Sequence, residues 1–110
     1  MKAWSAALVD QVTGWPHVST RAFFGFTALY REKSMFGLLP RTRGMRTANS
    51  LAFKLEAKTT AVLARLDKDP RIASTQLQKT RWFTFEVSSN ADLHDVVHWL
   101  GQAYEAAGRT

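Results

Sequence analysis

The spacing of hydrophobic residues changes along the chain, and each change marks the border of a predicted element. Three segments have apolar residues every three to four positions, as on one side of a helix: 3–13, 60–68 and 90–107. Six segments have apolar residues in alternation, as on one side of a strand: 18–24, 26–30, 35–39, 50–56, 72–78 and 82–87. The predicted order of elements is therefore α-β-β-β-β-α-β-β-α.

Glycine and capping residues stand at several of these borders. Gly14 is predicted to take a left-handed conformation at the end of the first helix. Gly25 interrupts the first run of alternating residues and is predicted to form a bulge or a bend. Before the last helix, the Ser89 hydroxyl and the Asp92 carboxylate are spaced so that each can bond the other residue's backbone amide.

This order predicts a single α+β domain over residues 1–110, with helices packed on a mainly antiparallel, twisted sheet. Phe23 and Phe24 fall on opposite faces of that sheet, as do Trp82 and Phe83, because neighbouring strand residues point in opposite directions. Three helices can cover one face and part of the other. A protein partner or self-association, for example as a homodimer, is expected to cover the remaining aromatic surface.

The composition limits where the protein is expected to work. Cysteine is absent, so neither a disulfide nor a thiolate metal site is possible. The N-terminal apolar run is too short for a secretory signal, and no run reaches the roughly 20 apolar residues of a membrane helix. We therefore expect a cytoplasmic protein that does not contact the membrane.

Positive charge is concentrated in the middle of the chain. The net charge is +6, yet residues 21–81 alone carry thirteen Lys or Arg against four Asp or Glu. Such a segment indicates either a site for an anionic partner, nucleic acid among them, or a solubilising surface. The residues predicted to form the anion or nucleic-acid site are Arg41, Arg43, Arg46, Lys54, Lys79 and Arg81.

No catalytic pattern emerges from the residues that usually carry chemistry. His94 and His98 are spaced four apart on the last helix, which resembles part of a zinc-protease motif. However, Asp95 stands where that motif has Glu, no third ligand is indicated, and both histidines are predicted to face solvent. The chain also has no nucleophile elbow and no phosphate-binding loop. No enzyme activity, metal or cofactor is therefore expected.

Several segments together resemble a known family. Phe24-Gly25, Leu29-Tyr30-Arg31 and Met35-Phe36-Gly37 are similar to the N-terminal domain of TfoX competence regulators. The later segments LAFKLE, KTRWFTFEV and DLHDVVHWLGQAYEAAG resemble the same domain and its relative, the YjbR (MmcQ) family. The resemblance implies an α+β domain of the YjbR and type III secretion-chaperone kind, without known catalytic residues.

The chain also departs from that family in two places. Phe26 stands where the family often has a second glycine, and Glu32-Lys33-Ser34 lacks the turn glycine. Full TfoX regulators carry a further, C-terminal helical domain that these 110 residues do not include, so a role in competence is not carried over. The leading hypothesis is a non-enzymatic binding or regulatory module. The alternative is an auxiliary nucleic-acid-binding domain that uses the basic loop and an aromatic face of the sheet.

Overall fold

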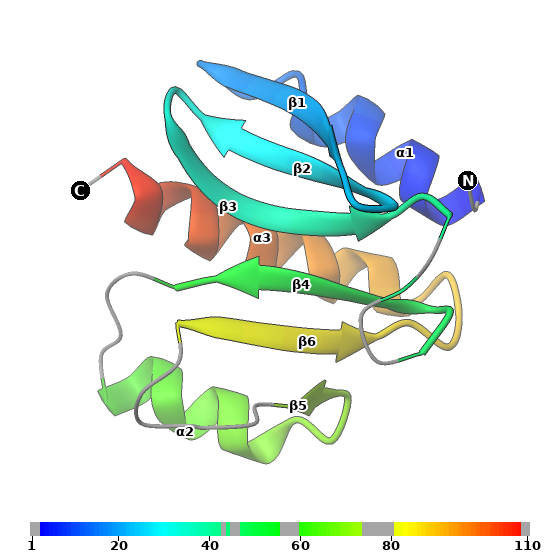
Figure 1. Cartoon of the computed structure of the whole chain (residues 1–110). Helices are drawn as coiled ribbons and strands as arrows, with labels where there is room; N and C mark the ends of the chain where they lie inside the picture. Colours follow the sequence, from blue (N-terminus) through cyan, green and yellow to red (C-terminus); the bar gives the residue numbers. More distant parts are fainter. Residues whose placement is uncertain (1–2, 43, 45–46, 56–59, 74–80, 109–110) are drawn as a thin grey trace.

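A computed structural model describes residues 3–42, 44, 47–55, 60–73 and 81–108 of the chain. It is an α+β fold in which helices pack against an antiparallel sheet (Figure 1). The elements are α1 Ala3–Val12, β1 Val18–Phe23, β2 Phe26–Arg31, β3 Ser34–Pro40, β4 Ser50–Lys54, α2 Thr60–Lys68, β5 Ile72–Ala73, β6 Trp82–Glu86 and α3 Asp92–Ala107.

The predicted fold class and order of elements are confirmed. The six strands form one sheet in the order β1-β2-β3-β4-β6-β5, and every neighbouring pair is antiparallel. The segment that separates β4 from β6 in the sequence contains α2 and β5, and β5 returns to the edge of the sheet beside β6. Of the strand predicted over 72–78, the structure describes only the first two residues.

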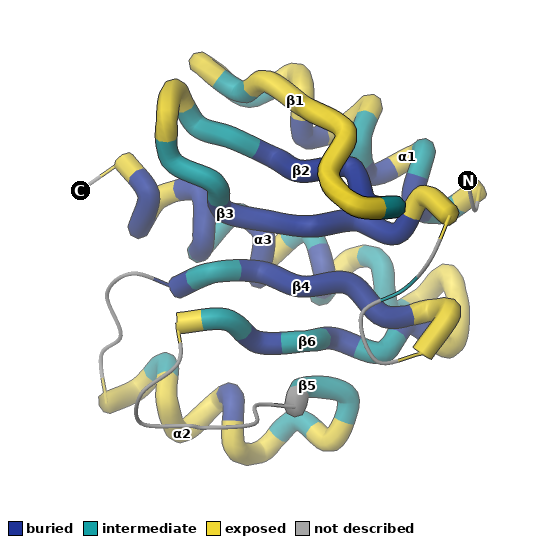
Figure 2. Tube along the Cα trace, viewed as in Figure 1, coloured by how far each residue is buried: buried dark blue, intermediate teal, exposed yellow. Residues whose placement is uncertain are grey.

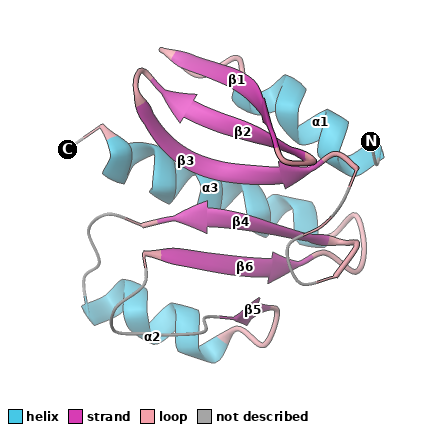
Figure 3. Ribbon diagram, in the orientation of Figure 1, coloured by secondary structure: helices cyan, strands magenta, loops and turns pink. Residues whose placement is uncertain are grey.

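The main core lies between one face of the sheet and the helices (Figure 3). On that face, Phe53 of β4 stacks between Phe83 of β6 and Trp99 of α3, with ring centroids 5.9 and 5.6 Å apart. Leu8 of α1 and Leu66 of α2 belong to the same buried cluster. All three helices therefore contribute to the core on the same face.

Close contact between α3 and the sheet depends on a glycine. A Cβ atom at Gly37 of β3 would lie 3.2 Å from a methyl carbon of Leu100 and 3.1 Å from one of Leu29. Such distances are too short for comfortable carbon–carbon contact, whereas glycine lets the helix lie directly on the strand. Leu100 is completely buried at this point, so the fit of α3 onto β3 depends on both residues.

The opposite face of the sheet, called the open face below, carries a second and smaller apolar cluster. Its buried members are Phe26, Ala28, Leu38 and Ala52, and the half-buried Tyr30, Met35 and Trp82 pack against them. No helix that the structure describes lies over this face, which points toward the viewer in Figure 2. The sequence prediction that both faces carry large apolar side chains therefore agrees with the structure.

Two local predictions need correction. Gly25 forms neither a bulge nor a simple bend, because Phe24 and Gly25 are a two-residue turn between β1 and β2 with φ values of 46° and 87°. The register shift lies instead between Leu29 and Tyr30. Gly14 is not left-handed; His17, with φ 65°, takes that conformation after α1.

One half of the capping interaction predicted at the start of α3 is present, namely the bonds to the Asp92 carboxylate. The Asp92 carboxylate accepts hydrogen bonds from the backbone N–H groups of Ser88 and Ser89, at 2.8 and 3.1 Å. The helix itself begins at Asp92, and the residue before it, Ala91, has no capping side chain. The negative charge of Asp92 therefore lies where the N-terminus of the helix stabilises an anion.

Candidate functional site

Aromatic and basic side chains meet at one end of the open face. Tyr30 of β2 is paired directly with Met35 of β3, and Lys54 of β4 is paired directly with Trp82 of β6. Paired residues of antiparallel strands share a face, and these strand ends lie at the same end of the sheet. We call Tyr30, Met35, Lys54 and Trp82 the open-face row.

Positive charge flanks this row. The guanidinium carbon of Arg21 lies 5.3 Å from the centre of the Tyr30 ring, a distance at which a cation is attracted to an aromatic face. Arg81 lies at the other side, where its carbonyl accepts a 2.7 Å hydrogen bond from the N–H of Leu55. The row therefore combines the rings of Tyr30 and Trp82 with the cation of Lys54, and Arg21 lies over Tyr30.

Two described acids lie at opposite ends of the sheet: Glu32 stands in the turn between β2 and β3, close to Tyr30, and Glu86 lies at the far end of the open face. Glu86 is the last residue of β6, whereas Trp82 is the first, and Glu86 pairs with Ser50. Its two carboxylate oxygens lie 2.9 and 2.6 Å from the Thr47 hydroxyl, which donates to one of them.

The structure separates the basic residues that the sequence grouped together. Lys54 and Arg81 are neighbours, because β4 ends beside the start of β6. Arg41 follows the end of β3, which lies beside the start of β4 and therefore at the opposite end of the sheet. The remaining three predicted residues lie outside the described part of the chain: Arg43, Arg46 and Lys79.

Arg41 instead lies beside an exposed aromatic tip. The carbonyl of Gly25 accepts hydrogen bonds from the backbone N–H groups of Arg41 and Thr42, at 3.1 and 2.9 Å. Phe24 in the same turn is 80% exposed, and its ring meets that of Phe23 edge-on at 4.9 Å. Sequence reasoning assigned both phenylalanines to a strand and so missed this tip.

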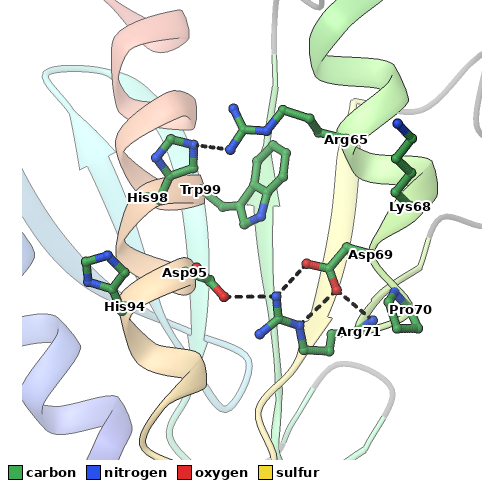
Figure 4. Close-up of a pocket in the computed structure, with 9 residues that line it drawn as sticks. All are labelled: Arg65, Lys68, Asp69, Pro70, Arg71, His94, Asp95, His98 and Trp99. Atoms are coloured by element: carbon green, nitrogen blue, oxygen red, sulfur yellow. Dashed lines mark hydrogen bonds and ion pairs between the residues drawn. The ribbon is translucent and has the colours of Figure 1, made fainter.

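A shallow cleft of about 660 Å³ lies between α2 and α3 (Figure 4). In it, the Arg65 guanidinium lies 5.2 Å from the Trp99 ring, and its Nη2 is 2.7 Å from Nε2 of His98. Because an arginine N–H can only donate, this bond requires a neutral His98 with its proton on Nδ1. His94 and His98 are both exposed, as the sequence predicted, and His94 also lines the cleft.

The acidic part of this cleft is occupied by a salt-bridge network. Arg71 contacts carboxylate oxygens of three aspartates: Asp69 at 2.7 Å, Asp92 at 2.8 Å and Asp95 at 3.0 Å. Its guanidinium carbon also lies 4.7 Å from the centre of the Phe85 ring. The network joins the end of α2 to the start of α3, so we interpret it as structural.

The electrostatics of this network follow from the hydrogen bonds. Bonds from Arg71 hold the pKa of Asp69 below its ordinary value, although desolvation acts in the opposite direction. The pKa of Asp92 is also lowered, first by the backbone N–H of Ser88 and then by Arg71. The pKa of Arg71 is raised, chiefly by its bond to Asp69. All three groups therefore stay charged at neutral pH.

Within the described residues, no three His, Asp or Glu side chains are grouped so that they could hold a metal ion. The helices described are also too short or too polar to cross a membrane. Comparisons with known proteins found no matching family, no matching curated protein and no matching solved structure. The likeness to TfoX and YjbR proteins therefore stays a prediction from the sequence.

Proposed function

We propose that this chain is a non-enzymatic binding module and that it recognises a protein partner through the open face of its sheet. The observation that carries the proposal is the one-sided packing of the fold. All three helices pack on one face, while Tyr30, Met35 and Trp82 remain only half-buried on the other. Large, partly exposed aromatic side chains are typical of the surfaces by which proteins bind one another.

The resemblance to the TfoX N-terminal domain and to YjbR proteins supports the same kind of function, since it implies a fold without known catalytic residues. The absence of cysteine agrees with work in the reducing cytoplasm, which we include in the proposal.

A variant of the row tests this function. Tyr30→Ala combined with Trp82→Ala removes both rings, while Leu63→Ala is a matched control because Leu63 is 39% exposed on α2. The immobilised wild-type chain and the control should retain the same protein from a native extract treated with nuclease, and the row variant should lose it. Equal retention by all three chains would contradict a role for the open face.

The basic residues around the row favour a second candidate function, the binding of single-stranded nucleic acid. Arg21 lies over Tyr30, and Lys54 is paired with Trp82, so a cation accompanies each ring. Single strands bind surfaces of this type by stacking bases on aromatic rings while cations neutralise the phosphates. Stacking on one ring contributes roughly 1–3 kcal/mol.

A salt titration with short single-stranded DNA and RNA tests this candidate. Two phosphate contacts, through Arg21 and Lys54, predict a slope of roughly −1.4 when the logarithm of the affinity is plotted against that of the salt concentration. Lys54→Gln should weaken binding and reduce the slope, whereas Lys68→Gln on α2 is the matched control. No binding at about 50 mM salt, the low end of the range in which such contacts are strong, would exclude this candidate.

A further inference from the structure

β1 is a long sheet edge with no neighbour on its outer side among the described residues. It forms one edge of the sheet and pairs with β2 in an unbroken register from Val18↔Arg31 to Phe23↔Phe26. Every residue of β1 after Val18 is exposed, as Figure 2 shows. A strand of this length and regularity is able to accept another strand.

The turn at Phe24-Gly25 determines which backbone groups point outward. In a two-residue hairpin the residues that flank the turn form a hydrogen-bonded pair, and such pairs then alternate along the strands. Phe23, Arg21 and Ser19 therefore direct their N–H and C=O groups toward β2. The bond from the N–H of Glu32 to the carbonyl of His17, at 2.9 Å, continues this pattern. The N–H and C=O groups of Thr20 and Ala22 consequently point away from the sheet.

β1 has few of the features by which proteins protect a free edge. Natural edges are usually short, or carry lysine, proline, a bulge or an inward-pointing charge. The sequence VSTRAF contains no lysine and no proline, and its register with β2 has no bulge. Its only charged side chain, that of Arg21, lies on the open face against the ring of Tyr30.

We infer that β1 pairs with β1 of a second copy of this chain, antiparallel and with Thr20 on the two-fold axis. In this register Val18 lies opposite Ala22 of the second copy, and the outward backbone groups of both strands meet. Arg21 lies opposite Ser19, so no like charges face each other. A register centred on Arg21 would also let the outward groups of Thr20 and Ala22 meet, but it would place two guanidinium groups directly opposite each other, which disfavours it.

The same register accounts for the exposed aromatic tip. With Thr20 on the axis, Phe23 and Phe24 of one copy lie beside His17 and Pro16 of the other, and the two-fold axis repeats this contact. Phe24 is 80% exposed and has a positive φ, an unusual combination for a large apolar residue. Contact with the second copy would remove this ring from water, which favours the pairing.

The dimer would join the two sheets into one, with both open faces on the same side. The inference does not rest on the proposed function, since it concerns the edge strand and not the open-face row. Replacing Trp82 by Ala should therefore leave dimer formation unchanged, whereas a disruptive substitution at Thr20 should weaken it.

Cysteine cross-linking tests the register, because the chain has no native cysteine. Thr20→Cys would lie opposite itself at a Cα–Cα distance of about 5.5 Å, within the range that a disulfide spans. Mild oxidation should therefore produce a covalent dimer. In Ala22→Cys the two cysteines would be about 14 Å apart, from the rise of about 3.4 Å per residue, and should not be linked.

Lys68→Cys, exposed on α2 beside the opposite edge of the sheet, is the control for random collision. If Thr20→Cys forms no more dimer than Lys68→Cys, the inference is wrong. If Ala22→Cys forms dimer in its place, the proposed register is wrong.

Sedimentation tests the pairing itself. We expect the wild type to dimerise at tens of micromolar, and a monomer throughout this range would overturn the inference. Thr20→Pro removes an outward N–H and leaves the bonds to β2 in place, so it should weaken the dimer about 10–100-fold. Thr20→Val keeps the N–H and should change little.

Thr20→Lys is the second disrupting variant. It keeps every backbone bond and places two like charges on the axis, so it decides the question if Thr20→Pro does not fold. Circular dichroism checks the fold of each variant. A folded Thr20→Lys variant that dimerises as strongly as the wild type would contradict pairing at this edge.

Discussion

The two edges of the sheet are built in opposite ways. The described part of β5 is Ile72–Ala73, and the salt-bridge network of Arg71 directly precedes it in the chain and holds it next to α3. β1 is six residues long, regular and exposed, and ends in an aromatic turn. One edge is thus held by charged side chains of this chain, whereas the other leaves backbone hydrogen-bonding groups exposed. We interpret the first edge as structural and the second as a surface for association.

The largest expected loss of stability comes from a substitution in the core, which should destabilise both edges of the sheet alike. Leu100 is fully buried on α3 and packs against Gly37 of β3, near the middle of the sheet. Leu100→Ala should lower the free energy of unfolding by roughly 2–5 kcal/mol, the range for a truncated buried leucine. Urea denaturation measures the loss. Leu63→Ala, at a partly exposed position on α2, is the control and should cost far less.

A substitution of Arg71 should destabilise the edge at β5 but not the edge at β1. Arg71→Met removes the charge shared by Asp69, Asp92 and Asp95 but keeps much of the side-chain volume. Because these side chains are only partly exposed, we expect a loss of about 1–3 kcal/mol, between the values for surface and buried pairs.

Arg21→Met on β1 is the matched control for that change and should stay within about 0.5 kcal/mol, as an exposed substitution. Amide hydrogen exchange should show the loss of protection near β5 and β6 in Arg71→Met. Equal effects of the two substitutions would contradict the difference between the edges.

Acid should weaken the β5 edge selectively. The pKa values of Asp69 and Asp92 lie below the ordinary value of 3.8, so their contribution to stability is fully present above that pH. It is lost as the pH falls below about 4 and through the lowered pKa values of the folded protein. The difference in urea midpoint between wild type and Arg71→Met should therefore be smaller at low pH than at pH 7. A difference that does not depend on pH would argue against the network.

The smallest expected effect is at the turn next to β1. A substitution there should leave the free energy of unfolding unchanged or raise it, whereas the changes above lower it. Phe24 has a φ of 46°, which asparagine adopts at lower cost than a large aromatic residue. Phe24→Asn should leave the stability of the monomer unchanged or raise it by about 0.5–1 kcal/mol. The same variant should dimerise more weakly, because the exposed ring is lost. A clear loss of monomer stability would show that Phe24 serves the fold and not association.

The order and type of the elements could be predicted from the residue pattern. Hydrophobic spacing depends on the geometry of one helix or strand at a time, so it can be read without knowing what packs on it. The exposure of His94 and His98 followed from the same geometry. The turn at Phe24-Gly25 was not predicted, because two-residue turns usually begin with asparagine, aspartate or glycine and not with phenylalanine.

Which side chains contact one another could not be predicted from the residue pattern. Arg41 and Lys54 appear in one basic segment of the sequence, but antiparallel strand directions place them at opposite ends of the sheet. Arg71 finds Asp92 and Asp95 more than twenty positions away, and all three helices pack on a single face. These contacts depend on long-range packing. A side chain's own neighbours in the sequence contain no information about which distant element will cover it.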